Sequence, residues 1–496
     1  MIDATTATTL SAPRTRSRTV LAAAVVPLTL LVLGAASCWL YFWGRDLHRF
    51  TQWVAAYIGL FLGQLAFYTV ACLIVLRWSG RSSRAARLAT VAVVFFFAVA
   101  FRAVLVPQRP YLSSDVYRYV WDGYVQRAGI NPYRYVPEAG ELTGLRDERI
   151  FPNINPEDRR WLSPYPPVAQ LVFFGVALVQ PKSVTAFKAA TTLFDTITIL
   201  LLMLVLARSG LDPARAILFA WHPLLVFEGA HSGHIEAVFI AFLALALLAW
   251  SHGKYALTGV ALALGTLVKF YPVLLLPVFL FAKPRDSIDR AAGQAEELSG
   301  SGFTRLVRRV IHKNNLAMLA AFVATAALAY APYVSAGENL FGFVRGYALE
   351  EGFVQSGARY FLLDAVRKLV PIPTTVFLIF FAACLIAVAL LLLLRVKRNA
   401  VDVARGATVL IGLFLLLITP RYAWYYAWLI PFLCFAPRVA WLYLTSASVL
   451  LYLLWYTPMV YPEIPLGLGA AIYGPTMTWL AWEWWTSKQR PVFIPR

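Results

Sequence analysis

Residues 111–167 read YLSSDVYRYVWDGYVQRAGINPYRYVPEAGELTGLRDERIFPNINPEDRRWLSPYPP and lie between two apolar stretches of the chain. This segment is rich in acidic residues, arginines, prolines and aromatic residues, whereas most of the remaining sequence is apolar enough to enter a lipid bilayer. Polar residues held against a membrane by flanking apolar helices indicate a site that faces water or a cavity. The segment therefore predicts a membrane protein whose functional site lies at the bilayer surface.

The composition is that of an integral membrane protein. Hydrophobic residues make up 60% of the 496 residues and charged residues 14%, whereas soluble domains carry roughly a quarter charged residues. The apolar runs are also too long and continuous for barrel strands, which alternate over about ten residues. We therefore expect an all-α, polytopic membrane fold.

The formal net charge is +19, and the basic residues that cause it cluster in short loops beside the apolar runs. This is the pattern of cytoplasmic loops under the positive-inside rule, so we expect the lipid bilayer as a partner and no nucleic acid. The four cysteines lie far apart inside apolar segments. They form no metal-binding or disulfide spacing and are interpreted as small hydrophobic residues.

The loop charges also predict the topology. Segment 166–179 is short, and if it crossed the membrane the basic loop 208–215 would lie outside, so we expect 166–179 to be juxtamembrane or re-entrant. The alternation then gives about 14 crossings (range 11–14), with both termini and the loop 283–315 in the cytoplasm and the loops 107–167 and 335–370 outside. The predicted crossings cover residues 20–43, 53–76, 88–106, 185–207, 214–230, 235–250, 255–268, 271–282, 316–334, 372–394, 407–420, 422–436, 439–457 and 467–485.

Asp115 is the first acidic residue of the outward segment, nine residues after the end of the predicted crossing over 88–106. A carboxylate at the membrane surface can act as a general base. However, Ser113, Ser114 and Asp115 also precede a helical pattern, and spacing alone favours a helix N-cap. Asp122 falls on the same predicted helix face two turns later, and Arg118 between them can neutralise either carboxylate.

One outward turn interrupts an apolar run with His231, His234 and Glu236. Ionisable side chains at membrane depth are costly and usually face a cavity, which favours a functional role. A turn of satisfied polar groups is the alternative. A complete set of metal ligands is not visible, and no metal or cofactor is expected.

Two lone cations, Lys269 and Arg421, stand close to prolines at two other outward turns. Cations in this position suggest an anion at the membrane surface, and the phosphate of a lipid is the obvious anion there. Snorkelling of each side chain to the interface is the alternative.

Together these motifs resemble the membrane glycosyltransferases of the GT-C superfamily, and most closely family 87 and related polyprenyl-phosphate-mannose-dependent mannosyltransferases. The resemblance covers about residues 88–435, between an additional hairpin in 1–87 and C-terminal helices in 436–496. The stretches that carry it are SSDVYRYVWDGYVQRAGINPYRY (113–135), SPYPP (163–167), AWHPLLVFEGAHSGHIEA (220–237), ALGTLVKFYPVLLLP (263–277) and, more weakly, TPRYAWYYAWLIPF (419–432).

The resemblance implies transfer of a hexose, most often mannose, from a polyprenyl-phosphate sugar to a glycan or glycolipid acceptor, with inversion, on the non-cytoplasmic face of the cell membrane. An acidic residue of the first large external loop serves as base in such enzymes, and its motif position falls on Asp115. Many members carry a pair of acids there, but Ser114 occupies the preceding position here. That departure disfavours a metal-dependent enzyme with a diphosphate donor.

The remaining expected site residues follow from the same resemblance. The donor phosphate is expected to be bound by Lys269, Arg421, Arg118, His231 and His234. The groove for the sugar or acceptor is expected to be lined by Tyr117, Tyr119, Trp121, Asp122, Tyr165, Glu236, Tyr271 and Tyr422.

Two other functions remain open from the sequence. A lipid or solute transporter or flippase would explain the many helices and intramembrane charges, but it predicts internal repeats, and none is evident. A ligase that moves a whole glycan is the second alternative, and the sequence does not separate it from a hexosyltransferase.

Overall fold

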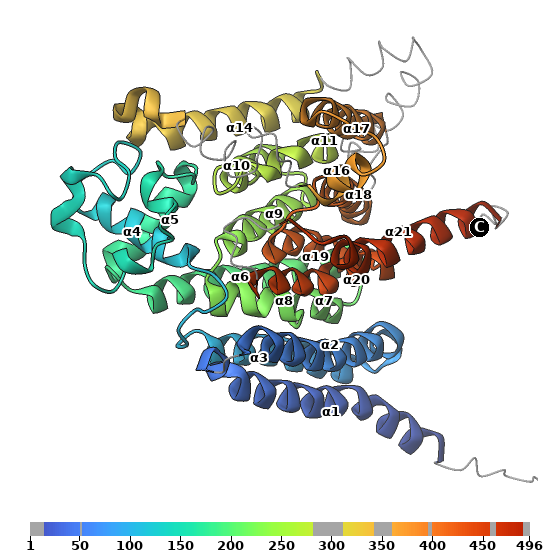
Figure 1. Cartoon of the computed structure of the whole chain (residues 1–496). Coiled ribbons are helices and arrows are strands. Elements are labelled where there is room, and N and C mark those ends of the chain that lie inside the picture. The colour runs from blue at the N-terminus through green and yellow to red at the C-terminus, as the bar shows by residue number, and fades with distance from the viewer. Residues whose placement is uncertain are drawn as a thin grey trace, which may run out of the picture.

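The computed structural model describes residues 14–49, 52–280, 311–341, 360–394, 399–456 and 463–489. All regular elements in these ranges are helices, and no strand is assigned within them (Figure 1). This agrees with the predicted all-helical membrane fold. Most of the expected cytoplasmic loop 283–315 and part of the expected external loop 335–370 lie outside the described residues.

Eight helices in the described ranges are long and apolar enough to cross a membrane. They are α1 (Arg14–Trp43), α2 (Trp53–Trp78), α3 (Arg84–Leu105), α6 (Val184–Arg208), α14 (Lys313–Tyr330) with η9 (Ala331–Phe341), α17 (Thr374–Leu394), α18 (Ala400–Ile418), and α20 (Val439–Ala447) with η11 (Ser448–Tyr456). Shorter apolar helices are α5 (Pro167–Val179), α9 (Glu236–Ser251) and α10 (Tyr255–Thr266). The chain is therefore a polytopic membrane protein, and the count of fourteen crossings stays a prediction.

The stretch expected as one helix over 214–230 is instead broken. Its pieces are η6 (Pro213–Ala216), α7 (Ile217–Ala220), α8 (Pro223–Val226) and η7 (Phe227–Ser232). Pro223 has no backbone N–H and its ring clashes with the preceding turn, which favours a break in the helix at this point. The last piece is a π-helical turn, a form that is frequent at functional sites.

Two other predicted crossings also contain irregular turns. Residues 271–282 begin with η8 (Tyr271–Leu275) before α11 (Leu276–Phe279), and residues 422–436 begin with η10 (Ala423–Leu429) before α19 (Ile430–Leu433). Irregular backbone at membrane depth is tolerated only where protein or a water-filled cavity surrounds it. The three broken stretches are therefore where a cavity is expected.

The observed start of a helix differs most from the predicted start at α18, which begins at Ala400, whereas its apolar run predicts a start at residue 407. The side chain of Asn399 accepts a hydrogen bond from the Asp402 backbone N–H at 3.1 Å, and this N-cap starts the helix before the apolar run. The predicted crossing over 467–485 corresponds to α21 (Leu466–Gln489), which is not among the eight long apolar helices.

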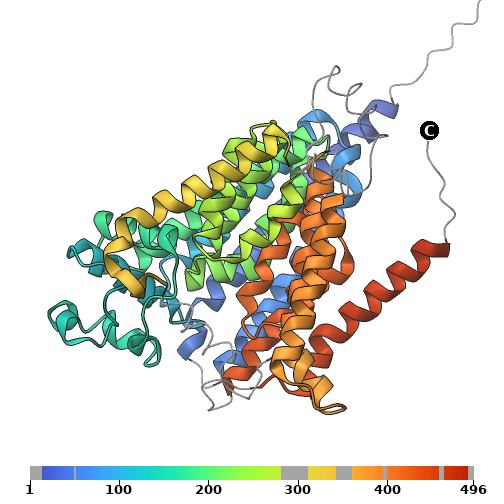
Figure 2. The ribbon, with the colours of Figure 1, turned by 90° about the horizontal axis from the view of Figure 1, so that it is seen from above.

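The helices form a stack in which α1, α2 and α3 lie on one side and α14 and α17 on the other (Figure 1). The segment 107–167, which carries α4 (Asp115–Arg127) and leads into α5, lies at the left end of the stack in both views (Figures 1 and 2). The N-terminal end of α1 and the C-terminal end of α21 lie at the opposite end. The two described ends of the chain are therefore remote from this segment.

The first hairpin is part of the same apolar core as the rest of the chain. Tyr57 of α2 packs its ring 5.0 Å from that of Phe227 and 5.3 Å from that of Tyr452, measured between centroids. It also lies 6.5 Å from the ring of Tyr111, which begins the outward segment. Helix α2 therefore supports the irregular segments directly, and a domain boundary near residue 87 stays a prediction.

A buried ion pair joins α3 to α6 and lies against the π-helical turn. Arg102 Nε lies 3.0 Å from Asp195 Oδ2, and both side chains are almost completely buried. Arg102 also donates to the carbonyl of Ala220 at 2.8 Å. Gly229 of the turn lies so close that a Cβ atom there would be 2.4 Å from Asp195 Oδ2. Paired charges of this kind avoid the cost of an isolated charge in the bilayer.

Helix α4 packs on α5 through Gly123, where the two backbones come into contact. A Cβ atom at Gly123 would lie 2.3 Å from the Phe173 carbonyl oxygen, which is backbone and cannot move aside alone. Gly123→Ala is therefore expected to push α4 away from α5 and to lower the free energy of unfolding by about 1–3 kcal/mol, as overpacking does. Thermal unfolding of the purified protein in detergent measures this.

The matched control is Gly175→Ala, on the exposed face of α5. No described atom comes within 4 Å of a Cβ built at Gly175, so this change should be neutral or stabilise the helix by up to about 1 kcal/mol. Equal midpoints for the two variants would contradict the close contact between α4 and α5.

Candidate active site

A cavity of about 450 Å³ lies where the outward segment meets the irregular turns. Its walls come from the segment 109–117, the loop 153–165, the end of α10 and the start of η10. The lining residues are Arg109, Pro110, Tyr111, Ser113, Ser114, Asp115, Tyr117, Asn153, Asn155, Asp158, Pro164, Tyr165, Lys269, Tyr422, Trp424, Tyr425 and Trp455. A cavity lined by both polar and aromatic side chains can bind a sugar and a phosphate together.

Asp115 is the first residue of α4, and its side chain is 28% exposed and lines the cavity. The Tyr119 hydroxyl donates to Asp115 Oδ2 at 3.4 Å. Burial raises the pKa of the Asp115 carboxyl above its ordinary value, and the Lys269 ammonium opposes this. A carboxylate that is partly desolvated but still reaches the cavity is suited to accept a proton.

The N-cap alternative for Asp115 does not match the geometry. The N-cap of α4 is Ser114, without a side-chain capping bond, and the Asp115 backbone N–H donates to Ser113 Oγ at 3.2 Å. Asp115 stands inside the helix, where its carboxylate is directed to the cavity and to Tyr119. Its role as a base stays a prediction.

Behind Asp115 a chain of buried ionisable groups leads into the protein. His234 Nδ1 lies 3.7 Å from Asp115 Oδ2, and His234 Nε2 lies 3.4 Å from Glu228 Oε2. The Tyr452 hydroxyl donates to the other oxygen of Glu228. His234 is 1% exposed and its ring stacks on that of Trp424, with centroids 4.1 Å apart. The imidazole therefore holds a fixed place among three carboxylates, because its Nδ1 also lies 3.9 Å from Glu236 Oε2, and from there it can help to position Asp115.

The turn that carries these groups needs glycine at residue 233. Gly233 has φ of +73°, in the left-handed region, and a Cβ atom there would lie 2.9 Å from Lys188 Cγ. His231 packs its ring 4.1 Å from that of Tyr111 and does not line the cavity. The sequence HSGHIE therefore reverses the chain sharply and sends His231 and His234 in different directions.

Lys269 lies just after the end of α10 and lines the cavity. Its ammonium forms an ion pair with Glu236, which begins α9, and both side chains are at most 5% exposed. The same ammonium lies 5.0 Å from the centre of the Tyr425 ring. An ammonium held by one carboxylate and one aromatic face keeps further donors for a ligand in the cavity.

The start of η10 forms an aromatic wall. Tyr422 stacks on Trp424 at 4.6 Å between centroids, and Trp424 carries His234 on its ring. Arg421 is buried, is not among the lining residues, and its guanidinium lies 5.7 Å from the centre of the Tyr422 ring. Arg421 therefore contacts this wall at Tyr422 without itself lining the cavity.

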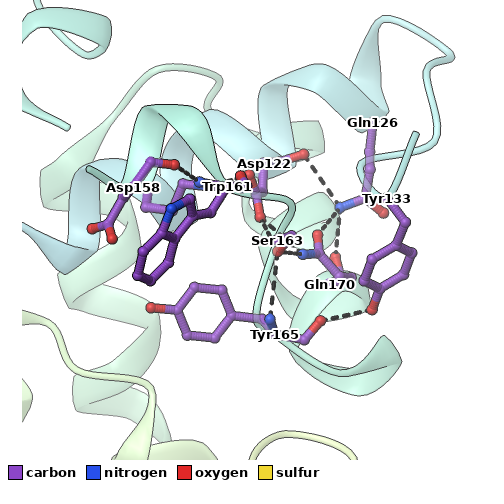
Figure 3. A network of polar contacts seen from close by, with 9 residues as sticks. Asp122, Gln126, Tyr133, Asp158, Trp161, Ser163, Tyr165 and Gln170 are labelled. Atoms are coloured by element: carbon purple, nitrogen blue, oxygen red, sulfur yellow. Dashed lines mark hydrogen bonds and ion pairs between the residues drawn. The ribbon is translucent and has the colours of Figure 1, made fainter. Parts of the chain in front are cut away.

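Asp122 and Arg118 belong to a structural network next to the cavity, shown in Figure 3. Arg118 Nε lies 2.8 Å from Asp122 Oδ1, and the other oxygen of Asp122 accepts from Gln170 Nε2 at 2.9 Å and from the Ser163 hydroxyl. Arg118 also donates to the backbone carbonyls of Asp158 and Trp161. These two residues fold the loop 158–165 onto α4 and do not line the cavity.

The structure brings together part of the expected site. Of the expected residues, the cavity is lined by Asp115, Tyr117, Tyr165, Lys269 and Tyr422. Those that lie outside its lining are Arg118, Tyr119, Trp121, Asp122, His231, His234, Glu236, Tyr271 and Arg421. Most of these nevertheless contact a lining residue, among them Tyr119, His231, His234, Glu236, Tyr271 and Arg421. Trp121 instead packs on Phe151, which is not a lining residue.

Two cavity residues that sequence reasoning missed are charged. Asp158 lines the cavity, and burial together with the nearby Asp115 charge raises its pKa to about 7, against the effect of Arg118. Arg109 also lines it and donates to Asn153 Oδ1 at 3.2 Å. Neither interrupts an apolar run, so no pattern distinguishes them from the other charges of the loop. In the described part of the chain, no group of three or more His, Cys, Asp or Glu side chains is placed to hold a metal ion.

Comparison with protein families gives two matches. Residues 19–284 match the N-terminal domain of the alpha-(1->6)-mannopyranosyltransferases, and residues 161–420 match glycosyltransferase family 87. Each match covers more than half of the chain, and the first includes α1 and α2. Comparisons with curated proteins and with solved structures give no significant match. The family expected from the motifs is thereby confirmed: the chain belongs to glycosyltransferase family 87 and is a mannosyltransferase.

Proposed function

We propose that the protein transfers mannose from a polyprenyl-phosphate mannose donor to a hydroxyl group of an envelope glycan or glycolipid, with inversion, on the non-cytoplasmic face of the membrane. The observation that carries this proposal is one cavity lined by both the Asp115 carboxylate and the Lys269 ammonium. A base for the acceptor hydroxyl and a cation for a leaving phosphate are the two groups that such a transfer needs.

In the proposed reaction Asp115 takes the proton of the acceptor hydroxyl. The hydroxyl oxygen forms a bond to the anomeric carbon from the face opposite the phosphate, while the bond from that carbon to the phosphate oxygen breaks. The lipid phosphate leaves with the electron pair, and Lys269 stabilises its charge. Asp115 then releases its proton to water in the cavity. A carboxylate that activates an attacking oxygen plays a comparable part in inverting glycosidases.

His234 and Glu228 support Asp115 in this proposal rather than the donor phosphate. The imidazole lies near the Asp115 and Glu228 carboxylates, and neither His234 nor Glu228 lines the cavity, which supports this assignment. Arg421 supports the aromatic wall through its contact with Tyr422, and this wall faces the donor. The surrounding apolar helices favour a lipid-linked donor over a soluble nucleotide sugar, because a polyprenyl chain can remain in the bilayer beside the cavity.

The test uses the purified protein in detergent with octyl α-mannoside as acceptor. Farnesyl phosphate mannose of β configuration should give a disaccharide with an α linkage, and GDP-mannose should give none. Mass spectrometry detects the product and NMR reports the anomeric configuration. A β-linked product would contradict inversion, and transfer from GDP-mannose alone would contradict the lipid-linked donor.

A further inference from the structure

The walls of the cavity differ in chemistry. The wall from the helix ends carries Lys269 and the aromatic rings of Tyr422 and Tyr425, whereas the wall from the external loop carries Asn155 and Asp158. The charge of Asp115 acts on both Lys269 and Asp158. A reaction that joins two substrates at Asp115 therefore has one subsite with the Lys269 ammonium and aromatic rings. The other subsite has the Asp158 carboxylate and the Asn155 amide, with Arg109 nearby.

The backbone of Asp158 is held in place, while its carboxylate is left available to a ligand. Arg118 donates to the backbone carbonyl of Asp158, and Arg118 is itself fixed by Asp122 at 2.8 Å. Figure 3 shows the Asp158 carboxylate pointing away from this network. Among the described residues no hydrogen bond or ion pair engages that carboxylate. Its backbone is thus fixed by Arg118, while both carboxylate oxygens remain able to accept hydrogen bonds.

Asn155 supplies the complementary group. Its side-chain oxygen accepts the backbone N–H of Glu157 at 3.1 Å, which leaves the amide NH₂ as a donor at the cavity. Arg109, held by Asn153, lies in the same lining and balances part of the negative charge. A carboxylate beside an amide donor matches sugar hydroxyls, which donate and accept at once. Two carboxylates in one subsite disfavour a second anion there.

We propose that Asp158 and Asn155 form the acceptor subsite and bind a neutral sugar through its unreacted hydroxyl groups. Asp158 accepts hydrogen bonds from one or two of these hydroxyls, and the Asn155 amide donates to another. Sugars that carry a phosphate or carboxylate near the reacting hydroxyl are excluded from this subsite. This inference rests on the proposed function for the direction of transfer, but binding of a neutral sugar can be measured without any donor.

The experiment measures Asp158→Asn and Asn155→Ala with octyl α-mannoside as acceptor and farnesyl phosphate mannose as donor. Asp158→Asn exchanges a charged acceptor for a neutral one and so weakens the hydrogen bond from the sugar hydroxyl. At a pH above the Asp158 pKa of about 7, this predicts a rise of about 10-fold in the KM for octyl α-mannoside. The KM for the donor should stay within about threefold, because Lys269 and not Asp158 faces it in the proposal. Glu148→Gln is the control, because Glu148 is exposed in the same loop and does not line the cavity. It should leave both constants unchanged.

A second readout needs no turnover. Saturation-transfer NMR on the full-length protein without donor should show octyl α-mannoside binding to the wild type, and weaker binding to both Asp158→Asn and Asn155→Ala. Deoxy derivatives of octyl α-mannoside identify the hydroxyl. The derivative that lacks the hydroxyl bound by Asp158 should lose more affinity with the wild type than with Asp158→Asn.

The outcomes separate the inference from the proposed function. A wild type that binds octyl α-mannoside through Asp158 but transfers nothing from the donor contradicts the proposed function and supports the subsite. Equal binding by well-folded wild type and both variants overturns the subsite, and so does a change confined to the KM of the donor. If Asp158→Asn unfolds, the Asn155→Ala result decides alone.

Discussion

Replacing Asp115 by Asn is expected to lower turnover by roughly two to four orders of magnitude, the usual range for general-base catalysis, while the protein stays folded. Asn has nearly the same shape and can still accept the hydrogen bond that Tyr119 donates at 3.4 Å. It cannot take up the acceptor proton. The α4 backbone should be unaffected, because the Asp115 carboxylate is not the capping group of the helix. Mannose transfer and thermal unfolding, measured on one preparation, check both parts.

The controls for this change lie in the same segment. Glu148→Gln removes an exposed negative charge from the same external loop and should be silent in both measurements. Asp122→Asn is not a silent control, since Asp122 pairs with Arg118 and accepts from Gln170. It should lower the unfolding midpoint, because Arg118 loses its buried counter-ion. A well-folded Asp115→Asn enzyme with activity within about tenfold of the wild type would contradict the base role and leave Asp158, the other carboxylate of the cavity, as the next candidate.

The pH dependence gives an independent check on Asp115. A base must be ionised, so kcat/KM should be full above the pKa of Asp115 and fall as the pH drops through it. Burial raises that pKa, and Lys269 holds it back. The acid limb should therefore lie above the pH at which an exposed aspartate titrates. Removing the Lys269 charge should move the limb to still higher pH, provided that the variant remains active enough to measure.

The sequence predicted the elements of this molecule better than the contacts between them. Long apolar runs with basic flanks identify helices such as α2, α3 and α6, because their signal is local. The breaks at Pro223 and at the π-helical turn were not predicted, since the apolar run continues through them. The bonds to that turn come from Thr191 of α6, which donates to the Gly229 carbonyl, and from Tyr452 of η11, which donates to Glu228. Contacts between residues that are far apart in the chain cannot be predicted from a local sequence pattern.

In the candidate site, too, the sequence predicted some of the residues but not their contacts. Lys269 stands out because it is a charge inside an apolar run, and Asp115 stands out by its motif position in the outward segment. Both line the cavity. The outward turn was also recognisable from His234 and Glu236, but which groups they contact depends on folding: Glu236 pairs with Lys269 on another element. Asp158 could not be chosen over its neighbour Glu157 from the residue type, because only the position of its backbone, fixed by Arg118, brings it to the cavity.

Replacing Lys269 by Met is expected to have two separable effects. It removes the cavity cation that the proposed donor phosphate needs, which should cost about tenfold or more in turnover. It also leaves the Glu236 carboxylate, 3% exposed, without its counter-ion. Removing one partner of a buried pair typically costs about 3–5 kcal/mol of stability. Lys269→Arg keeps the charge but changes its shape, so it should restore stability more completely than activity.

The double variant Lys269→Met with Glu236→Gln separates the two effects. It removes both charges and keeps side chains of similar length, and neutral replacement of a buried pair is often tolerated without loss of stability. Thermal unfolding should therefore return toward the wild type. If Lys269 stabilises the leaving phosphate, mannose transfer should remain at least about tenfold below the wild type even in this stable protein. If Lys269 serves only to neutralise Glu236, activity should recover together with stability. A recovery of both would show that Lys269 has a structural role only. Arg109, the other cation lining the cavity, would then be the candidate to bind the donor phosphate.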